Sequence, residues 1–316
     1  MLKVVFCGTP DISTECLQTL FELPNVEIIY VISQPDRPSG RGNKLKSPEV
    51  IELATTLGLK TFQTQNINKE PKFLSELESL KPDLFVVFAF AQFLGKKVLS
   101  LPRLGCFNIH TSLLPLYRGA APIHYAILNG DVQTGVSIQK MVKQMDAGDI
   151  CCDLALPISI DETTESLYVK LKSLASTLLK DFINSADNNT LSFKQQDESQ
   201  ASFAPTIKKD EGYIDFNSES AITIERKIRA FTPWPGIQFL LNNKRCKILK
   251  LKVSDEKIKP SQVLITKESF FIGCLNGSIE LLKIQIEGKQ AVDVATWING
   301  LQGQTPFISS ISKDQQ

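Results

Sequence analysis

The sequence is poor in the residues that build histidine-rich metal centres and disulfide frameworks. Its 316 residues include only two histidines, His110 and His124, so a zinc site built on histidine is not expected. The seven cysteines are an odd number, and none forms a C-x-x-C pair. Several of them lie in apolar runs, which is typical of reduced, buried thiols. We therefore predict a cytoplasmic protein without a bound metal.

Long apolar runs and two common nucleotide or nucleophile motifs are also missing. The strongest apolar run, residues 84–91, is too short to span a bilayer, and the chain enters a predicted strand at residue 2 without a leader-like segment. Gly8 stands in C-G-T-P-D-I-S, which lacks the second and third glycines of G-x-G-x-x-G, and this excludes NAD binding. We find no G-x-S-x-G nucleophile elbow either.

The first part of the chain alternates strand and helix patterns. A predicted strand at 2–7, helix at 12–21 and strand at 26–33 indicate a parallel βαβ unit. Further helices are expected at 47–57 (with Ser47 as N-cap and Pro48 as first helical residue), 69–80, 122–129 and 163–182, and strands at 84–88, 106–110, 135–140 and 149–160. We predict an α/β domain over residues 1–187.

The pattern of expected helices and strands changes after a polar stretch at residues 188–209, which we interpret as a linker. A helix is expected at 222–231. Short strands are expected at 238–241, 246–253, 262–265, 270–273 and 279–285. Short, closely spaced strands separated by Gly and Asn turns favour a small β-barrel, so we predict a second domain over residues 210–316.

Charge is distributed unevenly between these parts. From residue 200 onward there are 16 Lys and Arg against 12 Asp and Glu, whereas the first 199 residues hold 19 against 22. A basic C-terminal part suggests a polyanionic partner, and a chance imbalance on a solvated surface is the alternative.

Lys250 and Lys252 are expected on one face of a strand, opposite Leu249 and Leu251. There they either bind an anion or protect a strand edge from aggregation.

A second basic segment follows the strand at 26–33. Residues 34–46 hold two glycines and several cations, among them Arg41, Lys44 and Lys46. Ligands of open α/β sheets bind where strands end, so this segment could clamp phosphates. The alternative is an ordinary charged surface loop.

Three polar residues suggest a catalytic site. Asn108 and His110 lie two residues apart on a strand and so share a face, and Asp146 follows the strand at 135–140. An amide and an imidazole can stabilise an oxyanion, and a carboxylate can orient the imidazole. The set suits transfer of a carbonyl group to an amine through a tetrahedral intermediate, without a covalent enzyme adduct. A structural histidine beside a capping asparagine is the alternative.

Longer motifs around these residues resemble a known family. The runs N-I-H-T-S-L-L-P (108–115), Y-R-G-A-A-P-I (117–123) and D-A-G-D (146–149) are similar to the signature of folate-dependent formyltransferases. The N-terminal G-T-P (8–10), the segment 34–42 and the turn F-T-P-W-P (231–235) resemble the members of that family that act on methionyl-tRNA. The resemblance covers nearly the whole chain.

The resemblance implies a Rossmann-like catalytic domain joined to an OB-like β-barrel that binds tRNA. It implies transfer of the formyl group of 10-formyltetrahydrofolate to the α-amine of methionyl-initiator tRNA for translation initiation. Separately from the resemblance, we expect a monomer without metal. The residues that match the family are Asn108, His110 and Asp146 for catalysis, Ser112, Leu113, Leu114, Pro115 and Phe90 for folate, and Arg41, Lys44, Lys46, Lys250 and Lys252 for tRNA.

The chain departs from the family pattern at two places. Leu116 stands where a cation is usual, so no charge is expected there. Ala89-Phe90-Ala91 stands where A-Y-G is common, which removes a tyrosine hydroxyl and places alanine where a positive φ would favour glycine.

Two other functions stay open. One is formyl transfer to a small amine, such as an amino sugar nucleotide or glycinamide ribonucleotide. The other is a non-catalytic folate- or RNA-binding protein, against which the intact Asn-His-Asp set argues.

Overall fold

The chain forms two compact units. The computed structural model describes residues 1–39, 44–301 and 304–309. The first unit comprises Met1–Pro122, Gln133–Pro157 and Ser166–Pro205, and the second comprises Ile123–Val132, Ile158–Glu165 and the chain from Thr206 on. Residues 188–205, which were predicted to be linker, therefore pack with the first unit. The predicted domain limits themselves stay a prediction.

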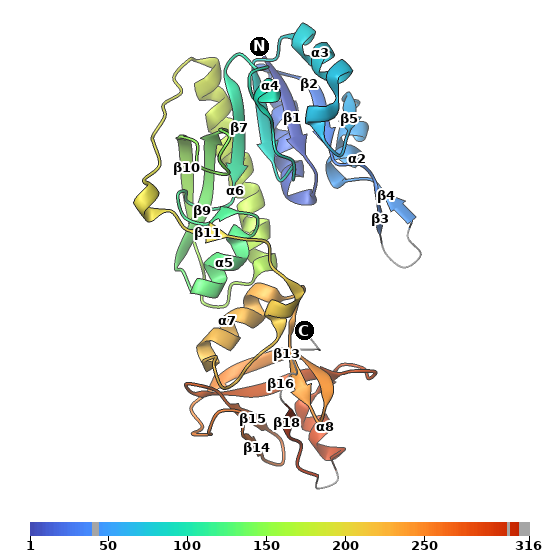
Figure 1. Ribbon diagram of the computed structural model, residues 1–316, viewed down its shortest axis with the longest axis vertical. Helices are drawn as coiled ribbons and strands as arrows, with labels where there is room; N and C mark the ends of the chain where they lie inside the picture. The colour runs from blue at the N-terminus through green and yellow to red at the C-terminus, as the bar shows by residue number, and fades with distance from the viewer. Residues whose placement is uncertain (40–43, 302–303, 310–316) are drawn as a thin grey trace. The chain divides into compact units, whose positions relative to one another are not determined.

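A seven-stranded sheet forms the centre of the first unit, in the order β10-β9-β7-β6-β1-β2-β5 (Figure 1). Five strands are parallel: β1 (Leu2–Gly8), β2 (Val26–Ser33), β5 (Thr61–Gln63), β6 (Leu84–Phe88) and β7 (Gly105–His110). Two are antiparallel: β9 (Gln133–Lys140) and β10 (Ile150–Pro157). This arrangement confirms the predicted Rossmann-like α/β fold.

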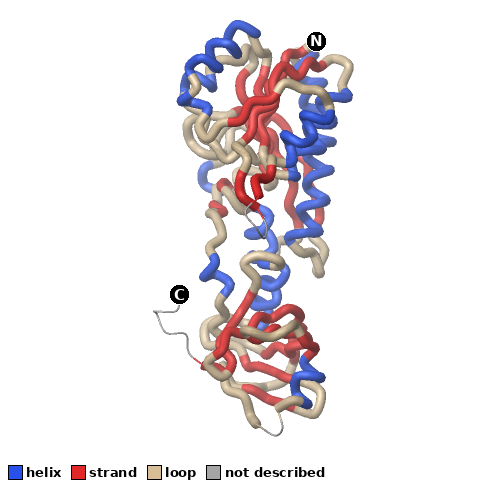
Figure 2. The backbone as a smooth tube through the Cα atoms, turned by 90° about the vertical axis from the view of Figure 1, so that its right-hand side faces the viewer, coloured by secondary structure: helices blue, strands red, loops and turns tan. Residues whose placement is uncertain are grey.

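Helices cover both faces of this sheet (Figure 2). They are α1 (Thr14–Glu22), α2 (Glu49–Thr56), α3 (Pro71–Leu80), α4 (Lys96–Leu99) and the long α6 (Thr164–Asp187). On one face Val5 and Cys7 of β1 join a buried cluster with Phe73 of α3. On α6, Phe182 packs against Phe107 of β7 with ring centroids 4.8 Å apart. Burial on both faces explains why β6 and residues 4–7 of β1 are continuous apolar runs.

Two local predictions in the first unit were wrong. Helix α2 begins at Glu49 with Pro48, in extended backbone, at the N-cap position. Ser47 is therefore one residue too early to cap the helix, and its hydroxyl donates to Asp36 Oδ1 at 2.9 Å. The basic segment is also more regular than a loop, because β3 (Arg37–Ser39) and β4 (Lys44–Lys46) pair as an antiparallel ribbon. That pairing satisfies backbone groups which a free loop would leave to water.

The second unit is a nearly closed antiparallel barrel, as predicted. Its main elements are α7 (Ala221–Phe231), β12 (Ile237–Leu241), β13 (Lys244–Ser254), β14 (Val263–Ile265), β15 (Phe270–Gly273) and β16 (Ser278–Ile286). Helix α5 (Pro122–Asn129) lies almost entirely in this unit. Sequence patterns missed β17 (Val292–Asp293), α8 (Val294–Asn299) and β18 (Ile308–Ser309).

One strand of the barrel departs from simple alternation. The register between β13 and β16 shifts on both sides of Lys250. Leu249 is consequently 40% exposed and does not share a covered face with the half-buried Leu251, contrary to the prediction. A bulge places consecutive residues on the same side, which a period-two pattern cannot anticipate.

The strand order places a ligand site in the first unit. Strand β1 leads through α1 to β2 on one side, and β6 lies on its other side, so the order reverses at β1. Ligands of open α/β sheets bind beyond the carboxyl ends of strands at such a reversal. In the part of the chain that the structure describes, no helix is long and apolar enough to cross a membrane.

Candidate active site

A cavity of about 990 Å³ opens at the carboxyl ends of these strands. Segments that follow β1, β2, β6 and β7 line it, together with the loop after β9; the lining includes Thr9, Gln34, Phe90, Asn108, His110 and Asp146. All three residues predicted to be catalytic therefore meet at one cavity. Among residues 1–39, 44–301 and 304–309, no three His, Cys, Asp or Glu side chains cluster in a way that could hold a metal ion.

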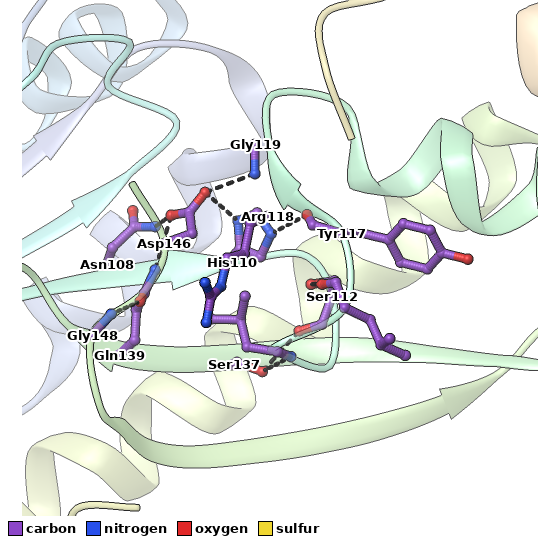
Figure 3. A network of polar contacts seen from close by, with 12 residues as sticks. Asn108, His110, Ser112, Tyr117, Arg118, Gly119, Ser137, Gln139, Asp146 and Gly148 are labelled. Atoms are coloured by element: carbon purple, nitrogen blue, oxygen red, sulfur yellow. Dashed lines mark hydrogen bonds and ion pairs between the residues drawn. The ribbon is translucent and has the colours of Figure 1, made fainter. Parts of the chain in front are cut away.

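The catalytic candidates are linked through the Asp146 carboxylate (Figure 3). Asn108 Nδ2 donates to Asp146 Oδ1 at 3.2 Å, and the backbone N–H of Gly119 donates to Asp146 Oδ2 at 2.9 Å. Asp146 Oδ2 also lies 3.7 Å from His110 Nδ1. An asparagine amide carries two N–H donors, so Asn108 keeps one for a substrate.

The imidazole of His110 is held from its other side. Its Nε2 lies 2.8 Å from the carbonyl oxygen of Tyr117. A carbonyl oxygen only accepts hydrogen bonds, so Nε2 carries a hydrogen and Nδ1 is the nitrogen left for chemistry. Nδ1 faces Asp146, and the ring is 6% exposed, so the pair lies at a nearly dry edge of the cavity.

Unusual backbone conformations surround this pair. Asp146 and Tyr117 are left-handed, with φ of 50° and 59°. This conformation is uncommon for residues other than glycine. Residues that adopt it cluster at functional sites, where the surrounding structure holds them in place. Gly148 explains part of the tight turn, because a Cβ there would overlap the carbonyl oxygen of Lys140. The loop that carries Asp146 thus lies directly against β9.

Two buried glutamines, which the sequence interpretation missed, hold that loop. Gln139 of β9 donates from Nε2 to Asp146 Oδ1 at 2.9 Å and accepts from the Gly148 N–H at 3.1 Å. Gln196 donates from Nε2 to the carbonyl oxygens of Asp146 at 2.8 Å and Gly148 at 2.7 Å. Strand β9 also buries the polar Thr134 and Ser137, so no sequence pattern singled out Gln139. Gln196 lies in a uniformly polar stretch, which gave no signal either.

Arg118 is the third residue that was missed. It belongs to the two-residue strand β8 (Arg118–Gly119), which pairs with β11 (Phe203–Ala204), and it is 1% exposed. Its guanidinium donates to Gln196 Oε1 from two nitrogens, at 2.8 and 3.1 Å, and to both carboxylate oxygens of Glu198. These hydrogen bonds lower the pKa of Glu198. Arg118 thus ties the chain around residue 196 to the Gly119 side of the site.

The apolar wall of the cavity follows β6. Phe90 is 2% exposed and lines the cavity, and its predicted folate contact stays a prediction. Both neighbours are left-handed, Ala89 with φ of 51° and Ala91 with φ of 57°. Position 91 therefore does adopt the backbone that favours glycine. Gln34 stabilises this conformation by donating to the carbonyl oxygens of Phe90 at 3.2 Å and Ala91 at 3.4 Å.

The segment Ser112, Leu113, Leu114 and Pro115 lies behind His110. Within the described chain, none of these four residues lines the cavity. Ser112 Oγ donates to the Leu116 carbonyl oxygen at 2.6 Å, and Ser137 Oγ bridges the Ser112 carbonyl oxygen and the Leu114 N–H. These contacts support the turn that leads to Tyr117. Their predicted folate contacts stay a prediction.

The residues predicted to bind tRNA are scattered over both units. Arg41 lies outside the described residues. Lys44 and Lys46 lie on β4, and Lys46 lines the cavity while its Nζ pairs with Glu49 at 2.7 Å, which raises the pKa of Lys46 and lowers that of Glu49.

The two remaining lysines are exposed residues of β13. Lys252 pairs with Glu280 at 2.8 Å. Lys250 is in register with Lys283 of β16, and like charges directly opposite each other are destabilising.

Comparison with known proteins identifies the family. A model of the formyl transferase family matches residues 2–183, and a model of the formyl transferase C-terminal domain matches residues 206–302. The chain belongs to the formyl transferase family. This confirms the resemblance seen in the sequence, and it makes the chain a formyl-transferring enzyme.

Two curated family members illustrate the match. A methionyl-tRNA formyltransferase from Geobacter metallireducens is 36% identical over 300 residues, which cover 95% of this chain and 96% of the relative. One from Pseudoalteromonas translucida is 40% identical over 304 residues, covering 95% and 94%.

The fold agrees with solved structures of the family. An N-formyltransferase from Helicobacter canadensis, in complex with folinic acid and dTDP-3-aminofucose, superposes with a TM-score of 0.66 at 23% identity, over 89% of this chain and 99% of that one. At this identity the likeness supports the architecture of the family and nothing finer.

Proposed function

We propose that this enzyme transfers the formyl group of 10-formyltetrahydrofolate to the α-amine of methionyl-initiator tRNA. The observation that carries the proposal is the end-to-end match, at 34–40% identity, with eight relatives that are all named methionyl-tRNA formyltransferase. The convergence of Asn108, His110 and Asp146 on one cavity supports it. Initiator tRNA is charged and used where ribosomes work, so a cytoplasmic location remains part of the proposal.

The cavity fits a large planar donor. Its volume of about 990 Å³ is at the upper end of ligand sites, which leaves room for the end of a second substrate. Phe90 and Met141 supply apolar walls, and backbone groups near Ala89 and Ala91 can fix the edge of a heterocycle. Solved family structures hold folate derivatives: the Helicobacter canadensis protein holds folinic acid, and a sugar 3N-formyltransferase was crystallised with 5-N-formyl-tetrahydrofolate.

The chemistry needs an oxyanion partner and a route for protons. The neutral amine attacks the formyl carbon, a C–N bond forms, and the carbonyl electrons move to oxygen. The free N–H of Asn108 donates to that oxygen. When the bond to the folate nitrogen breaks, that nitrogen takes a proton and the former amine loses one. His110 Nδ1, which lies 3.7 Å from Asp146 Oδ2, can carry this proton between the two nitrogens. An α-amine has a pKa of roughly 7.7–8.0, so a neutral fraction exists without a strong base.

Positive charge on both units supports tRNA as the acceptor. Lys46 at the rim of the cavity and Lys250 on β13 are candidates for phosphate contacts, with Arg41 and Lys44 beside Lys46 in the sequence and Lys252 beside Lys250. Phosphate contacts release counterions, so the affinity for tRNA should fall steeply with salt.

The direct test is a formylation assay. The protein is incubated with 10-formyltetrahydrofolate and charged initiator tRNA, and we expect N-formylmethionyl-tRNA to accumulate. Absence of this product from a folded preparation, together with formylation of a nucleotide-linked amino sugar, would replace the proposal with the small-amine alternative.

A further inference from the structure

Gln139 is a buried amide placed directly opposite a catalytic candidate. It lies on β9, which runs antiparallel to β7, and in that register Gln139 pairs with Asn108. The side chain is 2% exposed. Burying an amide costs free energy unless its donor and its acceptor both form hydrogen bonds. The hydrogen bonds of Gln139 therefore indicate which groups it positions.

Both ends of the Gln139 amide contact one loop. Nε2 donates to Asp146 Oδ1, and Oε1 accepts from the Gly148 N–H and, at 3.4 Å, from Gln196 Nε2. The side chain therefore fixes the carboxylate and, two residues later, the backbone that carries it. Figure 3 shows Gln139 between Asp146 and Gly148.

These contacts determine which carboxylate oxygen faces the histidine. Oδ1 receives the two amide donors of Gln139 and Asn108, and Oδ2 receives the Gly119 N–H. Oδ2 is thus the oxygen presented to His110 Nδ1. An ionised carboxylate only accepts hydrogen bonds, so the Nε2 donor of Gln139 suits Asp146 Oδ1, and a hydrogen-bond acceptor in place of that donor would repel it.

We propose that Gln139 is a positioning residue that holds the ionised Asp146 carboxylate toward His110. The inference rests on the proposed function, because it takes Asp146 as part of the reacting centre. It adds a residue from β9 whose donor, and not merely its bulk, sets the geometry of that centre.

Two substitutions separate the donor from the bulk. Gln139→Met keeps the length of the side chain and removes both hydrogen-bonding ends. We expect kcat to fall by about 10–100-fold, the effect of a small misplacement of a catalytic group, with KM values within about twofold of wild type. Gln139→Glu keeps the shape but places a second carboxylate beside Asp146.

The pH dependence of Gln139→Glu is the decisive measurement. The titratable and charged groups around position 139 are Asp146, His110 and, through Gln196, Arg118. When two carboxylates lie side by side, their repulsion raises the pKa of one of them, so the pair binds a proton at a higher pH than a single carboxylate does. The variant should therefore be least active at pH 8, and its kcat relative to wild type should recover toward pH 6 as Glu at 139 gains a proton and donates again.

Gln133 provides the matched control. It lies on the same strand with an exposed side chain, so Gln133→Met and Gln133→Glu should follow wild type at every pH. Equal kcat for Gln139→Glu and wild type, or a loss that is constant from pH 6 to 8, would overturn the proposal. A wild-type protein that does not transfer the formyl group would refute the proposed function. An active wild type with an unchanged ratio of variant to wild-type kcat would refute the role of Gln139 alone.

Discussion

Backbone strain at Ala91, in the wall of the cavity, can be tested by a single substitution. Ala91 has φ of 57°, which crowds its Cβ against the following backbone. The left-handed region costs an L-residue roughly 1–2 kcal/mol, and glycine adopts it freely. Glycine also gives the unfolded chain more freedom, which offsets about 0.4–1 kcal/mol. Ala91→Gly should therefore stabilise the protein by about 0.5–1 kcal/mol.

The measurement is the melting temperature of the full chain by calorimetry. A gain of 1 kcal/mol raises the melting temperature of a domain of this size by about 2–4 °C. Ala155→Gly is the matched control, because Ala155 is an exposed residue of β10 in the same sheet, and glycine within a strand costs about 0.5–1 kcal/mol. If both variants lowered the melting temperature equally, the left-handed backbone at Ala91 would not be strained and our assignment of the wall would be wrong.

Three further predictions concern the site and the second unit. His110→Ala should lower kcat by about 10²–10⁴-fold while tRNA binding and the melting temperature stay near wild type, and unchanged turnover would refute the role of His110. Gly148→Ala should cost about 1–3 kcal/mol of stability and reduce kcat, because its Cβ would overlap Lys140; a stable, active variant would contradict the close approach. Burial lowers the pKa of His124, so the unfolded chain binds this proton more readily and stability falls as the pH drops below about 6.5. Urea unfolding at pH 7 and 5 should show a smaller acid loss for His124→Gln, and parallel losses would argue against a buried neutral ring.

The fold was predictable where strands are buried on both sides. Fully buried runs such as residues 4–7 of β1 and the whole of β6 must be apolar, so their positions are evident from the sequence. Short elements depend on partners instead. The ribbon of β3 and β4 depends on backbone pairing between two separate segments, with Arg37 in register with Lys46. No local pattern in a basic, proline-containing segment predicts this pairing.

The candidate site was predictable only in part. Asn108 and His110 are neighbours on one strand, and Asp146 stands in a recognisable motif. The residues that hold this set come from separate segments: Gln196 lies 50 positions beyond Asp146, and its contacts with the loop of Asp146 are to backbone oxygens. Backbone contacts of that kind leave no side-chain pattern, so the geometry emerges only when the chain is folded.

The left-handed residues show the same limit. Asp146 and Tyr117 take their conformations from the turns in which they stand, and a sequence pattern does not specify φ. Ala91 was the exception, because alanine at a position where glycine is common already raised the question of a positive φ.

The central claim is that the acceptor is the amine of methionine on initiator tRNA. The most direct measurement compares initial rates of formyl transfer from 10-formyltetrahydrofolate to charged initiator tRNA, charged elongator methionine tRNA and a nucleotide-linked amino sugar, in parallel and at low salt. The account predicts rapid formylation of the initiator tRNA, far slower reaction of the elongator tRNA and none of the sugar. Preferential formylation of the sugar would contradict it.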